Sequence, residues 1–131
     1  MQKLKTNKKE YISDIIIKKI ILEYSDNSIF ISTLWELRDI VPIYLISGFI
    51  ILKRYLKTMQ KRVSDLLLSK IFLACCWISV KIFNDTHISC NEFLDLYKIN
   101  YNEINLIEAH ILSKINYDLD ISHKEFVNWK N

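Results

Sequence analysis

The chain has 131 residues, half of them apolar and a quarter charged, which is typical of one globular domain. It contains one glycine and one proline, so hairpins, barrels and α/β crossovers, which need turn residues, are disfavoured. The composition therefore predicts an all-α fold with short polar connections. The net charge of +3 is mild, and four lysines among the first nine residues supply much of it. We interpret them as a solubilising terminus.

The sequence also restricts the location of the protein. The N-terminus has no apolar core after its lysines, so no signal peptide is expected. The apolar stretch VPIYLISGFIIL has 12 residues, too few to cross a bilayer, and no membrane association is predicted. The three cysteines form neither a disulfide framework nor a zinc spacing. We expect a protein of the cytoplasm, the nucleus or both.

Apolar residues at intervals of three and four predict a first helix over about 10–24. Polar residues 25–28 end it, and a short helix is expected within 30–40. Pro42 suits the first turn of a third helix, because its missing N–H has no partner there, and this helix should end near Thr58.

The most apolar helix is predicted to follow Ser64, a candidate N-cap, and to end at Phe83, enclosed by other helices. A shorter helix is expected within 89–99, and a last long helix from Asn102, as its cap, to about Ile115. The remaining residues should be extended or turned, with Ser122 able to cap a final turn. The prediction is one compact domain, with a basic leading segment over 1–28 and the main domain over 29–131.

Two charged residues do not fit the apolar pattern. Lys81 shares a helix face with Trp77 and has no acid three or four residues before it. Glu108 projects from an apolar stripe formed by Ile104, Ile111, Leu112 and Ile115. A carboxylate that is buried in such a stripe needs a partner. The sequence predicts that both charges belong to one site, although either side chain could also extend past the edge of a core.

Four motifs follow one another along the chain: RYL at 54–56, SVKIFND at 79–85, EINLIEAHIL at 103–112 and INYDLDISHKEF at 115–126. In this order and spacing they resemble a cyclin box, most closely that of the Pho80-like (P-type) cyclins. The resemblance extends from about Ile31 to Phe126. It implies a single cyclin-box helical domain, with a five-helix core and an extra N-terminal helix.

The resemblance also implies a function. Such a protein is no enzyme but a regulatory subunit that binds and activates a cyclin-dependent-like serine/threonine protein kinase. In cyclins, the lysine that closes the third box helix and the glutamate on the fifth clamp the kinase near its C-helix; here these are Lys81 and Glu108. Phe83, as an exposed contact after the helix end, together with Asp85 and Trp77, is expected to extend this kinase-binding surface.

Other chemistry has little support. The three histidines (His87, His110 and His123) share no ligand-like spacing with the cysteines, so neither a metal nor another cofactor is expected. No nucleophile–base–acid grouping is detectable, and a chain with one glycine cannot form a phosphate-binding glycine loop.

Two alternative functions stay open. A cyclin-fold domain that binds nucleic acid, as in general transcription factors, would use the basic residues of one neighbourhood (Lys53, Arg54, Lys57, Lys61 and Arg62). The other is a helical scaffold that no longer binds a kinase. Asn84 and Lys53, which stand where the cyclin pattern has acidic residues, favour the scaffold faintly.

Overall fold

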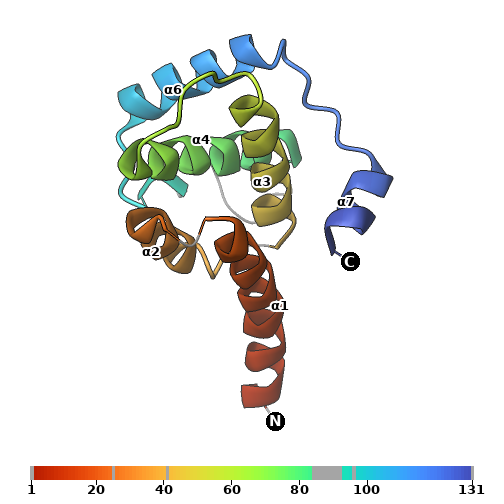
Figure 1. Ribbon diagram of the computed structural model, residues 1–131. Coiled ribbons are helices and arrows are strands. Elements are labelled where there is room, and N and C mark those ends of the chain that lie inside the picture. The colour runs from red at the N-terminus through yellow and green to blue at the C-terminus, as the bar shows by residue number, and fades with distance from the viewer. Residues whose placement is uncertain (1, 25, 41, 84–92, 96, 131) are drawn as a thin grey trace.

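The computed structural model describes the chain except residues 1, 25, 41, 84–92, 96 and 131 and the side chains of 2–11 and 130. The described residues form the helices α1 (Gln2–Glu23), α2 (Ser28–Glu36), α3 (Pro42–Leu56), α4 (Asp65–Phe83), α6 (Tyr101–Lys114) and α7 (His123–Lys130) (Figure 1). Residues 93–95 are also helical, and no strand occurs in the described ranges. The all-α prediction is confirmed.

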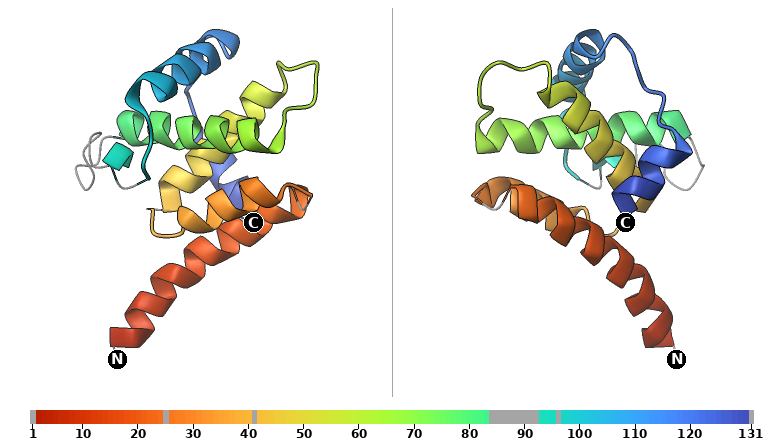
Figure 2. Two further views of the ribbon diagram at one scale, coloured as in Figure 1. Left: turned by 90° about the vertical axis from the view of Figure 1, so that its left-hand side faces the viewer. Right: turned by 45° about the vertical axis from the view of Figure 1, so that its right-hand side comes forward.

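Helix α4 lies at the centre of the fold. It packs against α3, with α6 on one side and α2 on the other (Figures 1 and 2). Eleven of its residues are buried, so the prediction of an enclosed helix is confirmed. Among the described residues, α4 is also the one helix long and apolar enough to cross a membrane. Since 61% of its most apolar window is buried against the other helices, these properties match those of a core helix.

The single glycine permits α3 and α4 to pack closely. A Cβ atom at Gly48 would lie 2.9 Å from Sγ of Cys76 and 3.3 Å from the Cα of that residue. Real Cβ atoms essentially never lie 2.9 Å from another heavy atom, and 3.3 Å is tighter than most of their contacts. A side chain at position 48 would therefore force Cys76 or the two helices to shift. Gly48 thus acts inside a helix, at a crossing point, rather than in a turn.

The N-termini of α2 and α4 are joined by side-chain caps. Ser64 accepts a hydrogen bond from the N–H of Leu67 at 3.2 Å, which confirms it as the N-cap of α4. The carboxylate of Asp65 accepts from the N–H groups of Ile29 and Phe30, both at 2.8 Å. These are N–H groups of the first turn of α2, whose own N-cap residue makes no side-chain cap bond. Asp65 therefore caps a helix that begins 37 positions before it.

Helix α1 begins earlier than predicted, at Gln2 instead of near residue 10. Residues 2–9 have no apolar periodicity, but lysine and glutamine are good helix formers and nothing there breaks the helix. The first turns of α1 extend away from the other helices (Figures 1 and 2).

Helix α6 is capped by Asn100 rather than by Asn102, because the Asn100 side chain accepts from the N–H of Glu103 at 3.0 Å. The last residues form a complete helix, α7, and not a single turn. Ser122 and Glu125 each accept a hydrogen bond from the other's backbone N–H at 3.1 Å. This reciprocal arrangement is a capping box, which stabilises a helix start.

Arg54 on α3 forms hydrogen bonds with the C-terminal segment. Its guanidinium donates to the carbonyl oxygens of Asp118 and Asp120 and to the carboxylate of Glu125, at 2.6–3.0 Å. The ring of Trp129 on α7 then meets that of Phe49 on α3 edge to face, with centroids 5.7 Å apart. Polar and aromatic contacts together bring α7 back onto the body of the domain.

We expect Gly48→Ala to lower the free energy of unfolding by about 1–3 kcal/mol, because the added methyl group overpacks the contact with Cys76. Ala is intrinsically the better helix former, so propensity alone predicts the opposite sign. Urea unfolding measures the difference. The exposed Ser32→Ala on α2 is the control and should change the value by less than about 0.5 kcal/mol. A stabilised Gly48→Ala variant would contradict the close crossing.

The stability of the domain should depend on pH through Glu125. The hydrogen bond from the backbone of Ser122 is the main cause that lowers the pKa of this carboxyl. Burial raises the pKa, but the hydrogen bond and charge of Arg54 lower it further, so that the net shift is downward. A lowered folded-state pKa stabilises above the unfolded-state pKa, and this contribution disappears as the pH falls through the folded-state value. Unfolding curves of wild type and Glu125→Gln should therefore differ at neutral pH and converge in acid. Curves with a constant separation at every pH would rule out this linkage.

Candidate functional site

Lys81 and Glu108, the two charges that do not fit the apolar pattern, form an ion pair between the end of α4 and the middle of α6. The structure thus brings together residues 27 positions apart that the sequence placed in one site. The Lys81 side chain is 35% exposed and that of Glu108 is 13% exposed. The pair therefore lies at the rim of the core, where the lysine reaches solvent and the carboxylate is mostly covered.

Trp77 lies beneath this ion pair. Its indole Nε1 donates to Oε1 of Glu108 at 3.2 Å, while Lys81 binds Oε2 of the same carboxylate. The Nζ atom of Lys81 also lies over the Trp77 ring, 4.8 Å from its centroid, within the range of a cation–π contact. Since Trp77 is only 3% exposed, it supports the pair from below and does not offer a surface of its own.

Phe83 does not have the exposed position that the sequence suggested. Its ring is partly buried between those of Tyr44, with centroids 6.5 Å apart, and Phe126, at 6.3 Å. Ile82, which the sequence analysis did not single out, is 39% exposed and lies directly after Lys81. Asp85 lies outside the described residues.

A second ion pair connects the same two helices. Nζ of Lys70 lies 2.9 Å from Oε1 of Glu103, and both side chains are about half exposed. The sequence analysis did not predict this pair. This pair resembles Lys81–Glu108 in residue types and in the helices that it joins, but the described structure gives it no buried donor.

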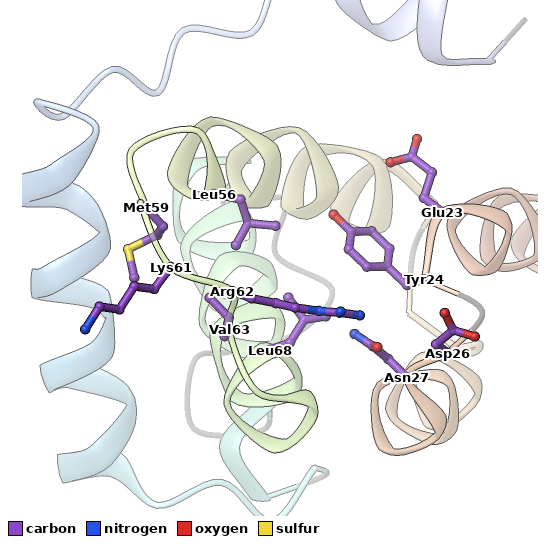
Figure 3. Close-up of a pocket in the computed structure, with 10 residues that line it drawn as sticks. All are labelled: Glu23, Tyr24, Asp26, Asn27, Leu56, Met59, Lys61, Arg62, Val63 and Leu68. Atoms are coloured by element: carbon purple, nitrogen blue, oxygen red, sulfur yellow. The ribbon is translucent and has the colours of Figure 1, made fainter.

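A cavity with a volume of about 330 Å³ lies elsewhere in the domain. In Figure 3 the side chain of Arg62 extends across it toward Asn27. The cavity lies between the end of α1, the end of α3 and the segment before α4 (it is lined by Glu23, Tyr24, Asp26, Asn27, Leu56, Met59, Lys61, Arg62, Val63 and Leu68). Neither Lys81 nor Glu108 contributes to it, so it is not part of the candidate site.

The described residues offer little for catalysis. Cys75 and Cys76 are fully buried free thiols, and burial raises the pKa of both, which disfavours the nucleophilic thiolate. No group of three or more histidine, cysteine, aspartate or glutamate side chains among the described residues could hold a metal ion. Cys90 and His87 lie outside these residues. Lys81 and Glu108 offer one hydrogen-bond donor and one acceptor at the rim of the core.

Comparison with known proteins points to one class. A stretch of 61 residues is 33% identical to PHO85 cyclin-5 of Saccharomyces cerevisiae, and it covers 47% of this chain and 27% of that protein. The chain thus matches about a quarter of the length of this curated relative. No protein-family model matches the chain, and neither does any solved structure. The similarity supports a cyclin-like relationship.

We expect Glu108→Ala to cost about 1–3 kcal/mol of unfolding free energy, because it leaves the Trp77 N–H without its acceptor in a buried position. Glu103→Ala removes an ion pair of the same type between the same helices, but an exposed one, and should cost less than about 1 kcal/mol. Chemical denaturation compares the two. Equal losses would show that Glu108 is held no more firmly than a surface carboxylate.

Proposed function

We propose that the chain is a cyclin-like regulatory subunit that binds and activates a cyclin-dependent-like serine/threonine protein kinase, without chemistry of its own. The observation that carries this proposal is the Lys81–Glu108 pair, on two helices that pack together, in a chain similar to a cyclin. A lysine and a glutamate at the ends of the same ion pair present one donor and one acceptor to a docking segment.

The surroundings of the pair suit a rigid docking surface. Helix α4 is buried along most of its length, and α6 packs on it beside the pair. Activation then follows from position: the fixed face holds the C-helix of the kinase inward, so that the kinase completes its own lysine–glutamate ion pair. Ile82 gives an exposed apolar contact next to Lys81.

The finer assignments are part of the same proposal. We infer a Pho80-like (P-type) cyclin whose cyclin box spans 29–131, working in the cytoplasm, the nucleus or both, in control of the cell cycle. The relative's name couples it to PHO85, so a kinase of that kind is the proposed partner.

The nucleic-acid alternative receives less support from the structure. Of its basic residues, Lys53 pairs with Glu23 at 2.9 Å, and Arg54 is held by Glu125 and by two carbonyl oxygens. These two cations are already neutralised within the domain, which weakens the local field that a phosphate backbone would meet.

Affinity capture from the source organism tests the proposal, with the kinase identified by mass spectrometry. The baits are the wild type, the site variant Lys81→Ala/Glu108→Ala and the control variant Lys70→Ala/Glu103→Ala. The wild type and the control should retain the kinase. The site variant should lose it, because removing desolvated charged contacts costs roughly 2–5 kcal/mol of binding free energy. Thermal unfolding verifies that each bait is folded.

The control separates the site from a general change of charge, since both variants remove one lysine and one glutamate from α4 and α6. A kinase that binds the site variant as well as the wild type would refute the position of the interface. If no bait retains a kinase, the regulatory assignment is wrong.

A further inference from the structure

We propose that Trp77 is the positioning residue of the site: it holds Glu108 independently of Lys81, so that a partner can draw Lys81 away without leaving the carboxylate unpaired. The inference deepens the proposed function, and in its last step it rests on that function. Two side chains, those of Trp77 and Lys81, share the carboxylate of Glu108.

The two oxygens of Glu108 have different donors. Oε1 accepts from the indole N–H of Trp77 at 3.2 Å, and Oε2 accepts from Nζ of Lys81. Because each donor has an oxygen of its own, removing one hydrogen bond does not require the other to break. A carboxylate has lone pairs for both bonds at once.

The two donors also differ in mobility. The Trp77 ring is 3% exposed and packs on Phe93, with centroids 5.9 Å apart and planes inclined by 34°. Phe93 in turn packs on Tyr97 at 5.0 Å, so the indole is fixed by a row of aromatic rings. Lys81 is 35% exposed and carries its charge on a flexible chain of four carbons. Lys81 is therefore the donor that can leave, and Trp77 is the one that stays.

This difference matters because Glu108 is mostly covered. A carboxylate with 13% exposure that lost its single donor would be left with a costly unpaired charge. With Trp77 in place, the departure of Lys81 leaves Glu108 anchored through Oε1 and frees Oε2 for a donor of the partner. The ring face that Lys81 covers is uncovered by the same movement.

A triple-mutant cycle tests this role in the full chain without a kinase. Trp77→Phe keeps a ring and removes the N–H, and Glu108→Gln keeps the shape and removes the charge. Both, singly and together, are made in the wild type and in the Lys81→Met background, and the unfolding equilibrium constants are measured in urea. In both backgrounds, we expect the unfolding equilibrium constant of the double variant to differ by roughly five- to tenfold from the value that the two single variants predict. This is the coupling expected when a charged hydrogen bond is replaced by a neutral one.

Simple packing of the Trp77 ring would give no coupling with Glu108→Gln, so that result would overturn the inference. Coupling that disappears in the Lys81→Met background would overturn it too, because Glu108 would then be placed by Lys81. Trp35→Phe on α2, combined with Glu108→Gln, is the matched control and should show additive effects.

If Trp77→Phe does not fold, the indole N–H signals of ¹⁵N-labelled tryptophan give a second measurement, with Trp35→Phe and Trp129→Phe for assignment. The Trp77 signal should move furthest in Glu108→Gln, which weakens its own hydrogen bond, and less in Lys81→Met, which removes only the cation above the ring. It should stay nearly in place in Glu103→Gln. An equal shift in Lys81→Met and Glu108→Gln would contradict the inference. Neither experiment uses a kinase, so a failure here leaves the capture test of the proposed function unaffected.

Discussion

The close crossing of α3 and α4 at Gly48 is the constraint on which the other contacts depend. Only a residue without a side chain lets the backbone of one helix approach Cys76 of the other so closely. Because α2 and α6 both pack on α4, the position of α4 relative to α3 also sets where these helices lie. The one glycine of the chain is used for helix packing, and the connections between helices are formed without it.

The candidate site depends on this arrangement in a direct way. Its three members come from two helices, and their geometry is that of the α4–α6 contact: Trp77 and Lys81 lie on one helix and Glu108 on the other. A hydrogen bond donated by a buried indole differs from a surface ion pair because water cannot easily replace it. The arrangement therefore combines a fixed part, the tryptophan and the carboxylate, with a movable part, the lysine. Such a combination suits a docking site, which has to be ordered before the partner arrives and free to exchange contacts when it does.

Much of the fold could be predicted from the sequence, since helical periodicity and the lack of turn residues are local signals. The meeting of Lys81 and Glu108 was also predictable, because each charge interrupts an apolar face and needs a partner. The position of Phe83 was not. It depends on α7 returning to α3, and that return depends on Arg54 meeting Glu125, 71 residues later in the chain. No periodicity encodes such a contact, because it is made between segments that are separate in sequence and polar in character.

The bond between Asp65 and the start of α2 has a consequence for how the domain assembles. A nine-residue helix is too short to be stable alone in water, and the first N–H groups of α2 find their acceptor only on α4. Helix α2 is thus complete only after the chain has been extended past residue 65 and α4 has taken its place beside it. During synthesis, the residues of α2 would leave the ribosome before Asp65, whose carboxylate caps the first turn of this helix. The first hydrogen bonds of α2 therefore depend on a residue that is synthesised later, and the start of α2 is capped only when α4 lies beside it.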